Sequence, residues 1–258
     1  MRRFWRRRTE TQDPRVVMAV LRNLPGVKPR RSLILCTDER TGSHFLAELL
    51  AATGRLGRAY EYFNTEWMQT HYADYPVERL GQLDWAMRLG TTANGVFSVK
   101  LHPWTMDVLA GVIDITRVWP MPCFVHLTRT DLLGQAISLH KAEQTRAYTS
   151  WSEPQAQPTY DGNRLRRLVH ELALRRERWE MYFARNGITP LRLTYEDIVT
   201  EPKATVRAVA RHVGVGLAAR RTRVPWFRFD RHADTVNTEW RQKFISEYKD
   251  TALLDKLD

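Results

Sequence analysis

The stretch from Ser32 to Phe63 constrains the fold more than any other part of the chain. It reads SLILCTDERTGSHFLAELLAATGRLGRAYEYF. Leu33 to Thr37 is typical of a short buried strand, and Thr41 to Ser43 forms a small turn. Apolar residues then recur at helical spacing until Gly54, which we interpret as the helix C-cap. The first N–H groups of such a helix favour a bound anion such as phosphate or sulfate.

Side chains at this turn indicate what kind of phosphate site it is. Arg40 offers a planar guanidinium and Ser43 a hydroxyl. An ATP or GTP P-loop requires G-x-x-x-x-G-K-[ST], whose lysine and hydroxyl serve the outer phosphates and magnesium. The chain lacks both that spacing and that lysine at this turn. Two interpretations fit these residues: Arg40, Thr41, Gly42 and Ser43 bind a nucleotide phosphate without a metal, or they form an ordinary turn between a strand and a helix.

Strand and helix patterns alternate along the remainder of the chain, which predicts one α/β domain with a central parallel sheet flanked by helices. With 258 residues, of which 43% are hydrophobic, the chain can form one sizeable core. Further strands are expected at 96–101, 124–128 and 191–194, and helices at 43–53, 77–89, 105–116, 131–146, 162–186, 202–213 and 235–248.

Polar residues follow the second and third strands, where ligands bind in parallel sheets. Lys100 and His102 lie on one side of an extended segment, because side chains alternate along a strand. Arg129 follows the third strand, and Ser138 lies on the helix after it. Arg129 and Ser138 could bind a second phosphate; alternatively, Arg129 pairs with Asp131 and Ser138 is a surface residue.

Glu61 is a candidate general base because it lies between Tyr60 and Tyr62. Aromatic neighbours would desolvate the carboxylate and raise its pKa. The alternative is a solvated glutamate on a loop. Trp67, Trp104 and Trp151 lie near expected loops, where an indole could stack on a sugar ring or adenine, although tryptophans also serve as core residues.

The net charge of +11 is concentrated at the N-terminus. Residues 1–31 contain ten Arg or Lys against one Glu and one Asp, a net charge of +8. We interpret them as a partly disordered basic arm before a single domain at 32–258. The arm is either merely solvated or in contact with anionic lipid, which Phe4 and Trp5 favour, and no pattern typical of nucleic-acid binding accompanies it.

Cys36 lies inside the first expected strand and Cys123 directly precedes the third, both in apolar surroundings, so we predict neither a disulfide nor a cysteine metal site. The apolar run from Val16 to Leu21 is too short for a secretory signal, and no run approaches the roughly 20 residues that span a bilayer. We therefore expect a cytoplasmic protein.

Six segments together resemble the trehalose 2-sulfotransferase family of bacterial carbohydrate sulfotransferases. They extend from about Leu33 to Phe244 in the family's order. The segments are ERTGS, ELLAATGRLGRAYEYF, NGVFSVKL, VHLTRTDLLGQAISLHKAEQTRAY, TYEDIVTEPKATVRAVARHVGV and RHADTVNTEW.

The resemblance implies a P-loop-like sulfotransferase fold, the donor 3′-phosphoadenosine 5′-phosphosulfate, a carbohydrate or glycolipid acceptor, and a homodimer. Residues 40–43 would match the loop for the 5′-phosphosulfate. Arg129 and Ser138 would match the pair for the 3′-phosphate, and Glu61 the general base. In the C-terminal segment that closes over the nucleotide, the matching residues would be Arg231, Asn237 and Trp240.

Two positions depart from the family pattern. His44 stands where the family usually has a small hydroxyl residue, so one donor to the phosphosulfate is missing or replaced by imidazole. His102 resembles the base histidine of the more distant animal cytosolic sulfotransferases. Glu61 and His102 are therefore both candidates for the base, while Lys100 would stabilise the charge that develops during transfer.

Two other functions are compatible with the residues alone. The first is a metal-dependent phosphotransferase, which would prefer ATP with magnesium. The second is a non-catalytic basic module for membranes or nucleic acid. Such a module would lose its function when residues 1–31 are deleted, whereas an enzyme would retain turnover.

Overall fold

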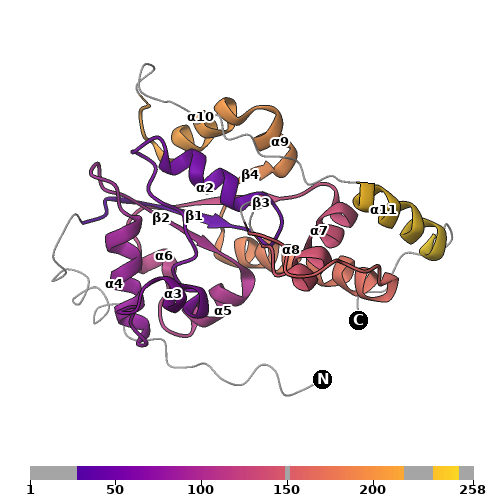
Figure 1. Ribbon diagram of the computed structural model, residues 1–258. Coiled ribbons are helices and arrows are strands. Elements are labelled where there is room, and N and C mark those ends of the chain that lie inside the picture. The colour runs from indigo at the N-terminus through magenta and orange to yellow at the C-terminus, as the bar shows by residue number, and fades with distance from the viewer. Residues whose placement is uncertain (1–27, 149–151, 218–234, 250–258) are drawn as a thin grey trace.

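The computed structural model describes residues 28–148, 152–217 and 235–249 (Figure 1). Four strands form one parallel sheet in the order β2-β1-β3-β4. The strands are β1 (Arg31–Cys36), β2 (Val96–Leu101), β3 (Pro122–Thr128) and β4 (Leu191–Thr194). The expected strands are confirmed, with β1 and β3 each beginning two residues earlier than the pattern predicted.

Strand β1 is buried on both faces, as its continuous apolar sequence predicts. Leu33 and Leu35 pack into one hydrophobic cluster, whereas Ile34 and Cys36 pack into another. This division follows from the alternation of side chains along a strand. The sheet therefore separates two layers of helices.

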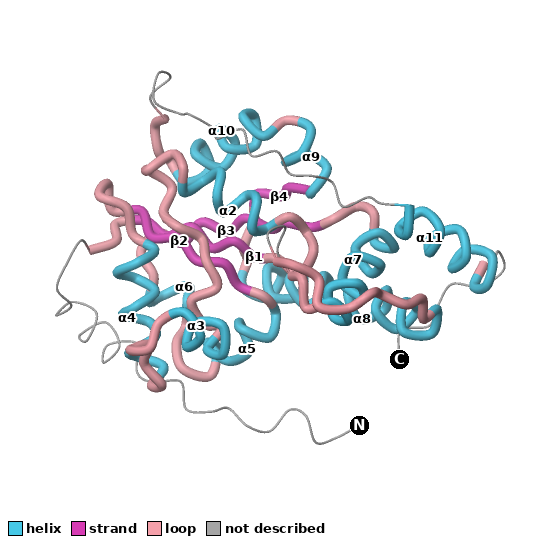
Figure 2. Tube along the Cα trace, in the orientation of Figure 1, coloured by secondary structure: helices cyan, strands magenta, loops and turns pink. Residues whose placement is uncertain are grey.

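The two layers are visible in Figures 1 and 2. Helices α2, α9 and α10 cover one face, and α4, α5, α6 and α8 contribute to the cluster on the other. The helices are α2 (Ser43–Ala51), α3 (Thr65–His71), α4 (Arg79–Gly90), α5 (Pro103–Ala110), α6 (Ile115–Val118), α7 (Leu132–Thr145), α8 (Gly162–Asn186), α9 (Tyr195–Thr200), α10 (Pro202–Val213) and α11 (Thr235–Tyr248).

A third hydrophobic cluster joins α7, α8 and α11 beside the sheet. Trp240 of α11 is 6% exposed and contacts the rings of His140 and Tyr160. Arg241 forms an ion pair with Asp131 at a distance of 2.5 Å. The C-terminal helix is thereby fixed to the helix that follows β3.

The register of the strands determines where their ends lie. Cys36 of β1 is level with Leu101 of β2 and His126 of β3. The N–H of Thr37 donates to the carbonyl of Leu101 at 3.0 Å, which holds the exits of β1 and β2 together. The chain runs from β1 to β2 on one side and then to β3 on the other, so β1 borders the switch point at which doubly wound sheets bind ligands.

Two predicted helices differ from the structure, and two short helices were not predicted. The segment 105–116 forms two helices, because the chain turns after Gly111 and Asp114 starts α6 by accepting a hydrogen bond from the N–H of Thr116. Helix α2 ends at Ala51, and Gly54, with φ of 63°, lies in the turn beyond it. Short helices α3 and α9 were not predicted.

Cys36 and Cys123 are both free, as expected. No described helix combines the length and apolar character needed to cross a membrane. The single domain at 32–258 stays a proposal, and most of the basic arm, residues 1–27, lies outside the described residues.

Candidate active site

The loop between β1 and α2 forms, together with the first residue of α2, a cradle of residues 37–43. Its backbone takes the left-handed conformation at Arg40, with φ of 60°, and at Gly42, with φ of 77°. Gly42 is also the N-cap of α2 and offers no side-chain hydrogen bond to the first turn. No side chain of the N-cap residue therefore accepts a hydrogen bond from the first N–H groups of α2, which leaves them available to an anion.

Tyr195, the first residue of α9, packs against the cradle. A Cβ added to Gly42 would lie 2.6 Å from the Tyr195 ring, so no side chain larger than hydrogen fits without movement. The guanidinium of Arg129 stacks on the same ring, 4.8 Å from its centroid. Tyr195 therefore joins the cradle to the end of β3.

Arg40 and Arg129 lie close together with few anionic partners. Burial lowers the pKa of Arg40, and the positive charge of Arg129 lowers it further. Arg129 donates to the carbonyl of Arg40 at 3.5 Å, while its carboxylate contact, to Asp131, is long at 3.9 Å. Its buried Nε has no hydrogen-bond partner among the described residues. An anion between these two guanidiniums would relieve their repulsion.

Ser138 connects the two predicted phosphate-binding groups. Its hydroxyl accepts a hydrogen bond from Nε of Arg40 at 2.9 Å, and Arg40 also donates to the carbonyl of Tyr148 at 2.5 Å. Ser138 is thus not a mere surface residue. The structure brings Arg40, Arg129 and Ser138 into one continuous polar cluster, which sequence analysis had treated as two.

The hydroxyl of Thr41 holds the cradle in shape. Thr41 is 2% exposed, and its Oγ1 contacts Oγ1 of Thr37 at 2.5 Å and donates to the carbonyl of Asp38 at 2.9 Å. Because this hydroxyl already forms two hydrogen bonds within the cradle, only the backbone N–H of Thr41 remains to bind an anion. Ser43 begins α2 and is buried as well.

Glu61, Lys100 and His102 form a second polar cluster beside the cradle. Tyr60 forms an isolated bridge with Val99 along the free edge of β2, which places Glu61 next to Lys100. Oε1 of Glu61 lies 2.8 Å from Nζ of Lys100 and 3.2 Å from Nε2 of His102. The expectation that Lys100 and His102 share one side is confirmed.

The predicted rise in the pKa of Glu61 was wrong. Burial alone would raise this pKa, but the positive Lys100, followed by His102, holds it well below its usual value. Asn64 also donates to Oε2 at 3.2 Å. Glu61 is consequently a carboxylate throughout the neutral pH range, with hydrogen-bond donors on both oxygens.

His44, in the first turn of α2, also faces this cluster. Its Nε2 lies 3.7 Å from Oε1 of Glu48. Burial lowers the pKa of His44, and the nearby charge of Lys100 lowers it further. An imidazole that favours the neutral form thus stands where the sequence comparison expected a hydroxyl.

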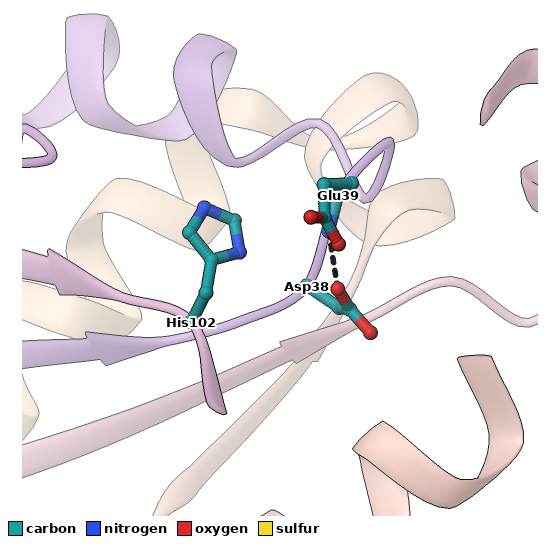
Figure 3. A group of neighbouring side chains, drawn as sticks. All are labelled: Asp38, Glu39 and His102. Atoms are coloured by element: carbon teal, nitrogen blue, oxygen red, sulfur yellow. Dashed lines mark hydrogen bonds between the residues drawn. The ribbon is translucent and has the colours of Figure 1, made fainter. Parts of the chain in front are cut away.

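Asp38 and Glu39, in the cradle, lie next to His102 (Figure 3). Their ligand atoms all lie within 4.8 Å of one another, a spacing that could hold a metal ion. Arg175 of α8 already contacts both carboxylates, at 3.4 Å to Asp38 and 2.8 Å to Glu39. A fixed cation at this position repels a metal ion, so the pair is better suited to hold a proton.

The two neighbouring carboxyl groups have opposite pKa shifts. Burial, followed by the proximity of Glu39, raises the pKa of Asp38 to about 9. For Glu39 burial acts in the same upward direction, but a hydrogen bond from Asp38 and then the imidazole of His102 hold its pKa below the usual value. At neutral pH one proton therefore remains on Asp38, and the remaining negative charge faces Arg175.

A family model described as Stf0 sulphotransferase matches residues 32–247. The chain belongs to this family. It is therefore a sulfotransferase, and the expected P-loop-like α/β fold with a central parallel sheet is confirmed.

The chain is also similar to proteins of known activity and to solved structures. The sulfotransferase is 26% identical to trehalose 2-sulfotransferase of Mycobacterium tuberculosis (strain ATCC 35801 / TMC 107 / Erdman), over 84% of this chain and 95% of that protein. It is 24% identical to trehalose 2-sulfotransferase of Mycolicibacterium smegmatis (strain ATCC 700084 / mc(2)155), over 84% and 94% respectively. Retinol dehydratase in a complex with retinol and PAP has a TM-score of 0.43 and 17% identity, over 81% of this chain and 67% of that one.

The C-terminal residues predicted to contact the nucleotide are only partly described. Asn237 of the sulfotransferase accepts a hydrogen bond from Nζ of Lys141 at 3.1 Å. Trp240 is buried between α7, α8 and α11, where it serves the core. Arg231 lies outside the described residues. The roles of all three in nucleotide binding stay predictions.

Four residues that contribute to the site could not be recognised from the sequence. Tyr195 lies inside the quoted segment TYEDIV, but nothing in that segment indicated that its ring contacts Gly42. Asp38 and Glu39 directly precede Arg40, and this position after a strand was the available signal. Arg175 lies on a distant helix with many charged residues, so no local pattern distinguishes it.

The pKa of Asp38 predicts how stability depends on pH. Because the folded chain keeps a proton that the unfolded chain releases near pH 4, stability should fall as pH rises from about 4 to about 9. Asp38→Asn cannot ionise. The melting temperature of this variant should therefore increase relative to that of wild type as the pH rises across this range. Thermal unfolding from pH 5 to pH 9 measures the difference. Asp74→Asn, on an exposed loop, is the control and should follow wild type. A difference between wild type and Asp38→Asn that stays constant with pH would contradict the proton assigned to Asp38.

Proposed function

We propose that this sulfotransferase transfers a sulfuryl group from 3′-phosphoadenosine 5′-phosphosulfate to a hydroxyl of a carbohydrate or glycolipid. The observation that supports the donor most directly is the pair Arg40 and Arg129, two adjacent guanidiniums at the uncapped start of α2. A nucleotide with phosphate at both its 3′ and 5′ positions suits this pair. The names of the mycobacterial relatives support a carbohydrate as the acceptor.

The polar groups divide the chemistry between them. The start of α2 and Arg40 would bind the 5′-phosphosulfate, and Arg129 with Ser138 the 3′-phosphate. The acceptor oxygen forms a bond to sulfur while the bond from sulfur to the bridging phosphate oxygen breaks, and the hydroxyl proton passes to a base. Lys100, 2.8 Å from Glu61, can stabilise the charge that develops on transferring oxygens. The metal-dependent phosphotransferase alternative lacks its P-loop lysine here, and the family match does not support it.

Binding of adenosine 3′,5′-bisphosphate, the product of the donor, tests the nucleotide site. Arg129→Ala should weaken this binding by about 10- to 100-fold, because charge-assisted hydrogen bonds to phosphate are lost. Titration calorimetry without magnesium provides the measurement. Arg117→Ala removes an equal charge from a residue whose side chain is 74% exposed, so it should bind like wild type. A wild-type chain that binds only ATP with magnesium would favour the phosphotransferase instead.

We assign the general base to Glu61, which is ionised and adjoins the cation that faces the reacting oxygens. Glu61→Gln should lower kcat by about 10²- to 10³-fold while bisphosphate binding changes little. His102→Asn should lower kcat less, since asparagine also suits the N-cap of α5. The depressed pKa of Glu61 places the acid limb of kcat below the usual range of a glutamate. Steady-state kinetics from pH 4 to pH 8 measure both effects; an active Glu61→Gln with an inactive His102→Asn would assign the base to His102.

The basic arm, residues 1–31, would bring the enzyme to anionic lipid at the inner face of a membrane. This part of the proposal depends on its net charge of +8 and on Phe4 and Trp5. A cytoplasmic location and a homodimer belong to the same proposal. Co-sedimentation with vesicles that contain phosphatidylserine should occur for the full chain and be lost at high salt. Deletion of residues 1–27 should abolish it, and equal binding by the shortened chain would refute the assignment.

A further inference from the structure

Exposed tryptophans in the described residues occur only beside the candidate active site. The six described tryptophans are Trp67, Trp85, Trp104, Trp119, Trp179 and Trp240. Trp67 is 44% exposed and Trp104 is 40% exposed, while none of the other four belongs to the exposed class. An indole in water is unfavourable, so two of them next to a reactive cluster indicate a ligand surface.

Trp104 is held in place by the polar cluster of Glu61, Lys100 and His102. It lies in the first turn of α5, whose N-cap is His102. The indole and the imidazole of His102 are parallel to within 5°, with their ring centroids 5.9 Å apart. Because His102 is itself buried and contacts Glu61 at 3.2 Å, the exposed ring of Trp104 has a fixed position relative to the carboxylate.

Trp67 likewise lies in the first turn of its helix, α3. The N-cap of α3 is Asn64, which accepts from the N–H of Trp67 at 3.4 Å and donates to Oε2 of Glu61 at 3.2 Å. The indole stacks on His71, with centroids 4.1 Å apart. The starts of α3 and α5 therefore both contact Glu61, and Figure 2 shows the two helices on the same side of the sheet.

The surroundings of the two indoles favour a sugar over a wholly apolar acceptor. Lys100, Asn64 and His102 all contact Glu61 and can form hydrogen bonds. Sugar rings combine apolar C–H faces with hydroxyl groups, so they match aromatic rings bordered by polar groups. A steroid or an acyl chain would instead need an enclosed apolar pocket. Two indoles whose side chains are about 40% exposed do not provide one.

We propose that Trp104 and Trp67 form the acceptor platform, on which a pyranose ring stacks and presents one hydroxyl to Glu61. This inference rests on the proposed function and deepens it. The platform determines specificity, because the ring that stacks there fixes which hydroxyl reaches the carboxylate. Its energetic effect belongs to acceptor binding and leaves the nucleotide site unchanged.

Kinetics with trehalose, glucose and mannose as acceptors test the platform. Trp104→Ala and Trp67→Ala should each raise KM for the accepted sugar by about tenfold, the size expected for loss of a stacked ring. Trp104→Phe keeps a stacking ring and should stay within about threefold of wild type. Affinity for adenosine 3′,5′-bisphosphate should be unchanged in all variants. Met181→Ala removes another exposed apolar side chain, on α8, and is the control.

The outcomes separate the platform from the proposed function. A wild-type enzyme that sulfates a sugar, with unchanged KM in both alanine variants, overturns the platform and leaves the proposed function standing. Turnover of 4-nitrophenol but of none of the sugars overturns the pyranose as occupant and the carbohydrate as acceptor, while the nucleotide assignment stands. Absence of both turnover and bisphosphate binding overturns the proposed function and the platform with it.

Discussion

Four strands that run in one direction end at one edge of the sheet, and the candidate site depends on this constraint. The cradle leaves β1, His102 leaves β2, Arg129 leaves β3 and Tyr195 leaves β4. None of these residues is near the next in sequence, yet the parallel register brings the ends of β1, β2 and β3 level. Repulsion between Arg40 and Arg129 is a cost that this arrangement imposes on the free protein. Burial of the sheet, whose strands β1 and β2 are covered on both faces, offsets this repulsion.

Much of the fold could be predicted because the strands are short continuous apolar runs. Their starts or ends differ from the structure by two residues at most. Helix ends were harder, since the apolar pattern of 105–116 continues across Gly111, where the chain turns. The seven-residue α3 has one buried residue, Met68, and so leaves too weak a pattern to recognise.

The candidate site could be predicted as a set of residues but not as a set of contacts. Arg40, Glu61, Lys100 and Arg129 could be found because each lies at a strand end or beside a recognisable segment. The direction in which the pKa of Glu61 shifts could not be predicted, because it depends on contacts with Lys100 and His102 that only the fold creates. The same reason applies to Asp38, whose environment includes Arg175 of a remote helix. Aromatic neighbours in sequence were therefore a misleading guide to electrostatics.

The position of β1 in the sheet separates the two halves of the site. Groups assigned to the nucleotide follow β1 and β3, whereas Glu61, Trp67 and Trp104 belong to segments along β2 and its free edge. Substitutions in α3 and α5 can therefore reshape one half while the Gly42, Tyr195 and Arg129 contacts stay intact. With the residue roles proposed above, such a division would let related enzymes diverge in their acceptors while they keep a common sulfuryl donor. Under the proposed acceptor platform, substitutions in the short helices α3 and α5 would be enough to change acceptor preference.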